Sequence, residues 1–236
     1  MKQIPPHSCK ECGKTYETIF SHLGEDDFNL FSESKVVRQY KNREIVFNEG
    51  GKAQGVYCIR EGKVKIYKNG VDGIEHITRI ALQGELMGIK AILSGHPYSV
   101  SAATIEDTVI CIIPKNVFFQ LTLRSPQFNQ AIIVFLSNLL ENAEARMLSL
   151  AHKHVRQRLA ESLLFLLQSF NPVTFPNSKL YLNITRHDLA NLIGSSSETL
   201  IRILGEMKDE GIIGIKGRKI FILDHQKLDK IASFIH

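Results

Sequence analysis

Glycine is distributed unevenly along this 236-residue chain, and its distribution limits what the chain can fold into. Glycine adopts backbone conformations that other residues avoid, so closely spaced glycines mark tight turns. Nine glycines between residues 50 and 95 predict many short strands over residues 35–113, arranged as a small antiparallel barrel or jelly roll. No glycine occurs in residues 115–170, where apolar residues recur at helical spacing. This second segment is predicted to be helical.

Within the helical segment, apolar residues step alternately by three and four positions. The residues of this stripe are Ile133, Leu136, Leu140, Ala143, Met147 and Leu150. Such heptad spacing is typical of a coiled coil between two subunits, so we expect a homodimer. The alternative is a helix packed against its own domain, because the run spans few heptads.

Residues 180–236 have a third pattern. Thr185 is suited to cap a helix over residues 186–193, which Gly194 ends. Ser195 or Ser196 can cap a second helix, over residues 197–210. Two short helices joined by a glycine turn are typical of a helix-turn-helix. The segments 212–215 and 219–223 then predict a β-hairpin, or wing, whose basic residues are Lys216, Arg218 and Lys219.

The second of these helices has the character of a DNA-recognition helix, which contacts base edges through its first turns. Glu198 and Arg202 are four positions apart and therefore share a face. A carboxylate can accept from cytosine N4, and an arginine can donate to guanine O6 and N7. The alternative is a surface ion pair between the two. The candidate DNA-contacting positions of this helix are Ser196, Ser197, Glu198, Ile201 and Arg202.

The positive charge of the chain lies mainly in its last third. Residues 1–151 contain 17 Lys and Arg against 16 Asp and Glu, whereas residues 152–236 contain 12 against 8. This excess favours a nucleic-acid partner, although basic surface is often only solvated. No apolar run approaches the length of a membrane span, and the N-terminus lacks the apolar segment of a secretory signal. We therefore expect a cytoplasmic protein without a membrane partner.

Residues 185–213 resemble the helix-turn-helix of the Crp/Fnr transcription regulators, whose recognition helix carries a Glu-Thr/Ser-x-x-Arg core. That core is Glu198-Thr199-Leu200-Ile201-Arg202 in this chain. The resemblance covers nearly the whole chain, and the turn glycines of the family's β-roll are matched by Gly50, Gly62, Gly84 and Gly88.

The resemblance implies an α+β fold with three parts. These are a cyclic-nucleotide-binding-type β-roll, a long dimerisation helix ending in a hinge at Arg158-Leu159-Ala160, and a winged helix-turn-helix. The implied domains are an N-terminal extension (1–25), a sensor domain (26–114), a helical connection (115–151) and a DNA-binding domain (152–236). The implied function is sequence-specific transcription regulation without enzymatic activity, with double-stranded DNA, a second copy of the chain and RNA polymerase as partners.

The β-roll departs from the family's cyclic-nucleotide binders. Those proteins hold the ribose with a Gly-Glu pair and the phosphate with an Arg-Ser/Thr pair. Here Ile89 follows Gly88, and Tyr98 precedes Ser99. A buried cyclic phosphate without a cation would lose its charge-assisted hydrogen bonds. We therefore predict that this roll does not bind cAMP.

The four cysteines suggest a different ligand. In the oxygen-sensing, Fnr-like branch, an N-terminal cysteine cluster and one cysteine on a late strand hold a [4Fe–4S] cluster. The resemblance implies Cys9, Cys12 and Cys111 as three of its four ligands, whereas Cys58 has no counterpart. One N-terminal cysteine is missing, although four thiolates are the usual complement.

Several outcomes remain open for these cysteines. The N-terminal pair could bind zinc with another partner, or it could be two unbound thiols beside a buried, inert Cys111. The place of the missing cysteine is taken by Tyr16, Glu17 or Thr18. Residues that could complete a ligand set are His7, Glu11, Glu17 and Cys58.

Two other functions compete with a DNA-binding regulator. One is a cupin-like metal enzyme on the same roll, but the roll offers only His76 and His96, in different segments. The other is a cyclic-nucleotide-type module that regulates another protein, which would not need residues 180–236. The sequence contains no nucleophile motif, P-loop or dinucleotide fingerprint.

Overall fold

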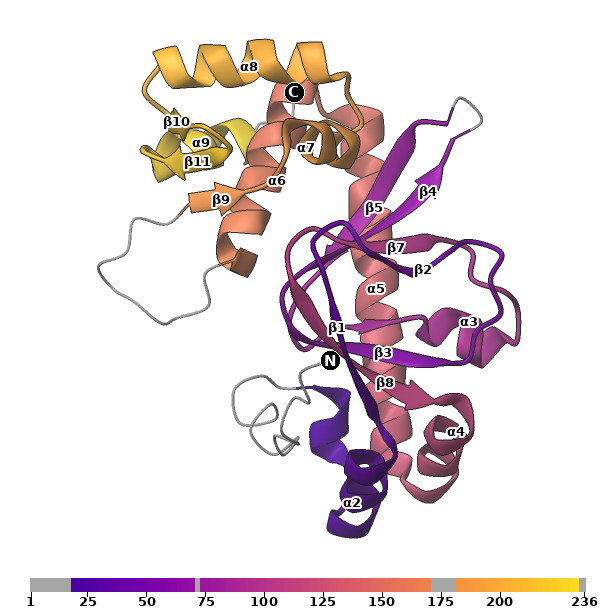
Figure 1. Ribbon diagram of the computed structural model, residues 1–236. Coiled ribbons are helices and arrows are strands. Elements are labelled where there is room, and N and C mark those ends of the chain that lie inside the picture. Colours follow the sequence, from indigo (N-terminus) through magenta and orange to yellow (C-terminus); the bar gives the residue numbers. More distant parts are fainter. Residues whose placement is uncertain (1–17, 71–72, 171–180, 234–236) are drawn as a thin grey trace. The chain divides into compact units, whose positions relative to one another are not determined.

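The computed structural model describes residues 18–70, 73–170 and 181–233 (Figure 1). The described residues form two compact units. One contains residues 18–68 and 78–141, and the other contains the remaining described residues of 69–77 and 142–233. Within the described ranges, no helix is both long and apolar enough to cross a membrane.

The first unit contains a β-roll with flanking helices. The elements are η1 (Ile19–His22), α2 (Glu25–Ser34), β1 (Val36–Tyr40), β2 (Ile45–Phe47), β3 (Gly55–Glu61), β4 (Val64–Asn69), β5 (Glu75–Ala81), β6 (Leu86–Met87), α3 (Ile89–Ser94), β7 (Ser101–Thr104), β8 (Thr108–Pro114), α4 (Lys115–Arg124) and the long α5 (Pro126–His152). Three of its elements, β4, β5 and α5, also have residues in the second unit.

The strands of the roll form two four-stranded sheets, in the orders β1-β8-β3-β6 and β2-β7-β4-β5. The described pairings are antiparallel, and β3 and β8 share the longest register. Glycines supply left-handed turn conformations as predicted, for example Gly62 at φ 92° and Gly84 at φ 84°. The predicted jelly-roll fold is therefore confirmed.

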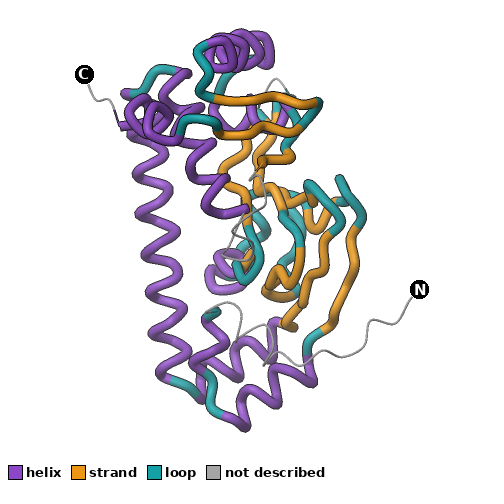
Figure 2. Tube along the Cα trace, turned by 90° about the vertical axis from the view of Figure 1, so that its left-hand side faces the viewer, coloured by secondary structure: helices purple, strands orange, loops and turns teal. Residues whose placement is uncertain are grey.

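Two hydrophobic clusters fill this unit. An inner cluster lies within the roll and includes Phe47, Ile59, Tyr98 and Ile110. An outer cluster lies between the β1-β8-β3-β6 sheet and the helices η1, α2, α4 and the first half of α5. Figure 2 shows the strands of the roll beside this part of α5. The sheet therefore has a core on each of its two faces.

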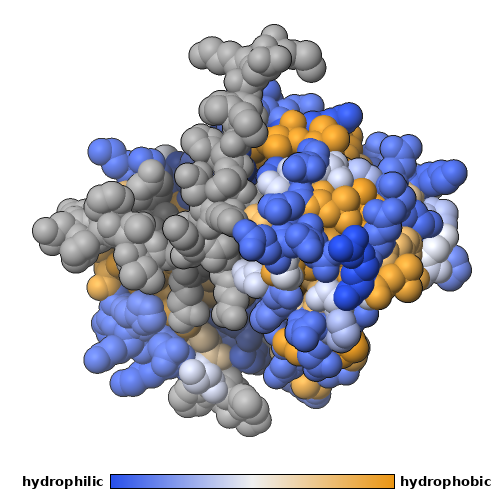
Figure 3. Space-filling model, turned by 90° about the horizontal axis from the view of Figure 1, so that it is seen from below, coloured by the Kyte–Doolittle hydropathy of each residue, from blue (hydrophilic) through white to orange (hydrophobic). Residues whose placement is uncertain are grey.

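The helices that cover the outer cluster keep polar residues toward solvent. In α2, Phe31 is buried, whereas Glu25, Asp26, Asn29 and Glu33 are exposed. Seen from below (Figure 3), the visible described surface carries hydrophobic patches among mostly hydrophilic residues.

The second unit contains a small sheet and short helices after the end of α5. Its elements are α6 (Val155–Phe170), β9 (Tyr181–Asn183), α7 (Arg186–Ile193), α8 (Ser197–Asp209), β10 (Ile213–Lys216), β11 (Lys219–Ile222) and α9 (His225–Ser233). The sheet has the order β10-β11-β9 and is antiparallel. The expected helix-turn-helix and wing are thus present.

The hinge expected at Arg158-Leu159-Ala160 lies elsewhere. These residues belong to α6, and the helical chain is interrupted earlier, at residues 153–154. The backbone N–H of His154 donates to Gln157 Oε1 at 2.8 Å, as in a helix N-terminal cap. A new helix therefore starts at Val155, which corrects the prediction.

Candidate nucleic-acid interface

The first helix of the helix-turn-helix begins and ends where local signals predict. The Oγ1 of Thr185 accepts a hydrogen bond from the backbone N–H of Asp188 at 3.0 Å and donates to its carboxylate at 2.6 Å. Gly194 ends the helix with φ 65°, a left-handed conformation that favours glycine. The buried side chains of α7 include Leu189, Ala190 and Ile193, as predicted.

The second helix presents one apolar face to the core and another face to solvent. Ser196 caps it by accepting from the backbone N–H of Thr199 at 3.1 Å. Its buried side chains are Leu200, Ile203, Leu204 and Met207. Of the candidate contact positions, Ser196, Glu198, Ile201 and Arg202 are exposed, whereas Ser197 is half-buried and not fully exposed as expected.

The predicted alternative for Arg202 was an ion pair with Glu198. The structure instead pairs Arg202 with Glu206, one turn further along α8. The side chain of Arg202 is 65% exposed, and exposed pairs of this kind contribute little to stability. Breaking this ion pair so that Arg202 can bind a base edge therefore costs little free energy.

The wing is a tight hairpin with a basic tip. Lys216 and Lys219 are paired in the register, and Gly217 between them has φ 59°. The side chains of Lys216, Arg218 and Lys219 are exposed. Arg186, at the start of α7, donates to the carbonyl oxygens of Gly217 at 3.2 Å and Arg218 at 3.4 Å. Burial lowers the pKa of the Arg186 guanidinium.

A further arginine, Arg158, holds the turn between the two helices, a role that no sequence pattern indicates. Its Nε donates to the carbonyl of Ile193 at 2.8 Å, and its Nη2 donates to that of Gly194 at 3.1 Å. Its Nη1 donates to Lys153 O at 2.8 Å. Carbonyls at a helix C-terminus lack partners within the helix, so Arg158 satisfies groups that would otherwise need water.

Known protein families match both parts of the chain. The cyclic nucleotide-binding domain family matches residues 37–125, and the Crp-like helix-turn-helix domain family matches residues 157–231. The fumarate and nitrate reduction regulatory protein of Vibrio cholerae is 31% identical over 228 residues, which are 95% of this chain and 90% of that protein. The chain belongs to the Crp/Fnr family of transcription regulators.

Other relatives and solved structures agree with this assignment. The electron transport regulator A of Shewanella oneidensis is 31% identical over 190 residues, covering 80% of this chain and 76% of that protein. The structure of FixK2 from Bradyrhizobium japonicum has a TM-score of 0.76 at 24% identity, covering 86% of this chain and 99% of FixK2. This Crp/Fnr protein is a DNA-binding transcription regulator and not an enzyme, as predicted. Neither alternative function finds support in these relatives.

The proposed dimer stripe of this regulator lies mostly on the surface of α5. Ile133, Leu140 and Met147 are 56%, 61% and 64% exposed. Ala143 and Leu150 are also exposed. Leu136 is the exception, because it is half-buried against the outer cluster.

The inner cluster of the roll contains aromatic side chains around Tyr98, one of the positions expected for cyclic-nucleotide contacts. Tyr98 is buried and stacks on Phe47, with ring centroids 4.2 Å apart. Tyr57 packs edge-on against Tyr98. Burial raises the pKa of the Tyr98 hydroxyl above its usual value. Ile89 is buried in the outer cluster.

The cysteines are only partly within the described residues. Cys111 lies in β8, on the late strand expected from the sequence, and is buried. Cys58 lies in β3 and is half-buried. Cys9 and Cys12 lie outside the described residues. In the part of the chain that the structure describes, no group of three or more His, Cys, Asp and Glu side chains could hold a metal ion.

Proposed function

We propose that this Crp/Fnr regulator acts as a homodimer that reads DNA with the first turns of α8. The observation that carries the proposal is the division of α8 into two faces. Leu200, Ile203 and Leu204 fix the helix to its domain, while Glu198 and Arg202 point to solvent at its N-terminal end. This is the part of a recognition helix that contacts base edges in the major groove. Ser196, Ser197 and Ile201 flank these two residues.

The wing residues have a different role in this proposal. Lys216, Arg218 and Lys219 contact phosphate, which positions the domain without distinguishing sequences. The hydrogen bonds from Arg186 to the carbonyls at the wing tip support this role, because they fix the turn that carries the basic side chains.

Dimer formation is proposed to use the exposed apolar stripe on α5. An exposed row of large apolar side chains is costly in water and is typical of an interaction surface. A second copy of the chain suits this stripe, because regulators of this family are dimeric and heptad spacing allows two such helices to pack on each other. Contact with RNA polymerase and a cytoplasmic location are proposed from the family alone.

The signal sensed by the regulator is proposed to be a metal-centred one and not a cyclic nucleotide. Tyr98 and Ile89 stand where cyclic-nucleotide contacts are expected, and Tyr98, which stacks on Phe47, carries no positive charge for a phosphate. The Fnr-named relatives and the position of Cys111 in β8 favour an iron–sulfur cluster. Thiolates are the donors that such a cluster requires, and Cys111 is the one of the three expected ligands that lies within the described residues. A bound cluster would supply redox sensitivity to the regulator.

The DNA-reading proposal is tested by selecting binding sites from random DNA and measuring variants on the selected site by gel shift. Arg202→Ala should cost about 1–3 kcal/mol and relax the preference for one G·C pair in each half-site. Arg218→Ala is the matched control, because it removes an arginine from the wing. It should weaken binding evenly on all sequences and lower the salt slope by about 1. Equal loss on all sequences for Arg202→Ala would contradict the assignment of α8.

A further inference from the structure

Glu206 of α8 lies between two arginines that come from different helices. Its Oε1 accepts a hydrogen bond from Nη1 of Arg202, one turn earlier on α8. Its Oε2 is 3.7 Å from Nη1 of Arg156, at the start of α6. The Nη2 of Arg156 also donates to Glu210 Oε2 at 2.5 Å. Arg156 therefore has carboxylate partners on two successive turns of α8 and braces Glu206 from outside that helix.

The pairing of Arg202 with Glu206 goes against the preference of an isolated helix. Glu198 and Glu206 are each four positions from Arg202. At this spacing, an acid that lies N-terminal to its basic partner has the more favourable orientation, and that acid is Glu198. The structure instead pairs Arg202 with Glu206, and Glu198 has no ion pair among the described residues. The brace from Arg156 gives a tertiary reason, because a carboxylate that is already held loses less side-chain freedom when it forms a further pair.

The choice of partner matters for the DNA-reading face of α8. An ion pair between Glu198 and Arg202 would occupy both the carboxylate that can accept from cytosine and the guanidinium that can donate to guanine. The pair with Glu206 keeps these two groups apart. The exposed fraction of the side chain falls from 65% in Arg202 to 41% in Glu206 and 32% in Arg156. Arg202 is therefore the member of this charged row that is most accessible to DNA.

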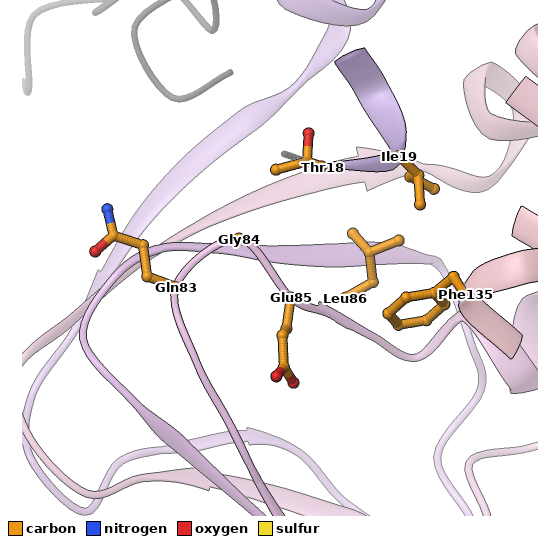
Figure 4. Close-up of a pocket in the computed structure, with 7 residues that line it drawn as sticks. All are labelled: Thr18, Ile19, Gln83, Gly84, Glu85, Leu86 and Phe135. Atoms are coloured by element: carbon orange, nitrogen blue, oxygen red, sulfur yellow. The ribbon is translucent and has the colours of Figure 1, made fainter. Parts of the chain in front are cut away.

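Arg202 keeps donors available while it is held, in contrast to Arg79 of the β-roll. Arg79 donates through Nη1 to Glu85 Oε2 at 2.5 Å and through Nη2 to the carbonyl oxygen of Leu86 at 2.7 Å. Figure 4 shows Glu85 and Leu86 at a cavity of about 230 Å³, with the Glu85 carboxylate turned away from Thr18. Both Nη groups of Arg79 are thus used within the fold. Among the described contacts, Arg202 uses Nη1 alone. A guanidinium has five N–H donors and guanine takes two, so Arg202 can reach a base edge without first leaving Glu206.

We propose that Glu206 is a positioning residue for sequence reading. Braced by Arg156, it holds the guanidinium of Arg202 apart from Glu198, so that both groups remain available to the bases. The inference rests on the proposed reading of a G·C pair by Arg202 and adds a residue that itself touches no base. Holding a long side chain in place beforehand reduces the rotamer freedom that is lost on binding. Without the carboxylate of Glu206, Arg202 pairs with Glu198, and that pair must break before a base is read.

The experiment measures discrimination with the full chain by gel shift. Discrimination is the ratio of the affinity for the selected site to that for a copy in which one half-site has A·T at the pair whose preference Arg202→Ala relaxes. Glu206→Gln should lower this ratio by about two- to fivefold, because an exposed ion pair then competes with the base. Asp209→Asn is the matched control, because it also removes a carboxylate from α8, but Asp209 is exposed and forms no ion pair among the described residues. It should leave the ratio unchanged.

Arg156→Ala is a second variant, which decides the matter if urea denaturation shows that Glu206→Gln does not fold. It should lower the ratio in the same direction, because Glu206 then loses its brace. An unchanged ratio for the folded variant, or an equal fall for Asp209→Asn, would overturn the proposal. If Arg202→Ala lowers the ratio and Glu206→Gln does not, the positioning role fails while the DNA-reading assignment stands. If Arg202→Ala relaxes no preference at all, the DNA-reading assignment fails and the positioning role fails with it.

Discussion

Arg158→Ala provides a direct test of how the helix-turn-helix is held together. The guanidinium of Arg158 donates to the carbonyls of Ile193 and Lys153 at 2.8 Å and to that of Gly194 at 3.1 Å. The first two bonds are partly buried, whereas the Gly194 carbonyl is exposed and can bond to water. A hydrogen bond to a charged group contributes about 1.5–3 kcal/mol, less when water can replace it. We therefore expect the variant to lose about 3 kcal/mol of unfolding free energy.

The assay is urea denaturation followed by circular dichroism. Protein concentration is kept fixed, because dissociation of a dimer makes the midpoint depend on it. With a slope of about 1–3 kcal/mol per molar urea, the midpoint should fall by roughly 1 M or more. DNA affinity should fall equally on all sequences, since the turn that positions α8 is loosened. Arg158→Lys should be intermediate, because one ammonium group cannot reach all three carbonyls.

Arg202→Ala is the matched control for this prediction. Arg202 is also an arginine of the helix-turn-helix, but it is exposed and paired only with Glu206 among the described contacts. Its loss should change the unfolding free energy by no more than about 0.5 kcal/mol while changing sequence preference. If Arg158→Ala and Arg202→Ala unfold at the same urea concentration, the carbonyl contacts of Arg158 do not stabilise the domain and the reasoning is wrong.

Three further predictions concern assembly, ligand choice and pH. Leu140→Glu should weaken the free energy of dimer formation by several kcal/mol, because it places two carboxylates in an apolar interface. A wild type that sediments as a monomer at micromolar concentration would refute the assignment of the α5 stripe as the dimer interface. Calorimetry with cAMP and cGMP should show no binding tighter than roughly millimolar, since Tyr98 offers a phosphate no cation; a micromolar dissociation constant would contradict this. A hydrogen bond from Arg156 lowers the pKa of Glu210, so their pair stabilises the fold above the ordinary carboxyl pKa and loses this effect as pH falls through the lowered value. The stability difference between wild type and Arg156→Ala should therefore shrink in acid, and a pH-independent difference would exclude the pair as its source.

The bounds of α7 and α8 could be predicted from the sequence because their signals are local. Thr185 and Ser196 are caps that bond to backbone within three residues, and Gly194 and Gly211 adopt left-handed conformations after the helices. The same signals failed for α3, which has only six residues and is too short to show a helical period. The sequence also predicts the wrong position for the break between α5 and α6, because no glycine or proline marks residues 153–154.

The contact partners of several side chains could not be predicted. Arg202 has Glu198 four positions before it and Glu206 four positions after it, and spacing alone does not show which of the two forms the ion pair. The contacts of Arg158 and Arg186 with carbonyls of distant turns carry no sequence pattern, because every residue has a carbonyl.

The sequence by itself determined the order of the parts: a glycine-punctuated roll, a glycine-free helical segment and a capped helix-turn-helix with a basic wing. These follow from backbone freedom and periodicity, which act over a few residues. Only the tertiary structure decided that Cys58 lies opposite Cys111, that Tyr98 stacks on Phe47 inside the roll and that Arg158 holds the turn before α8. Strand register and arginine–carbonyl contacts are set by packing between distant segments, and a one-residue change of register would have turned Cys58 to the other face of the sheet.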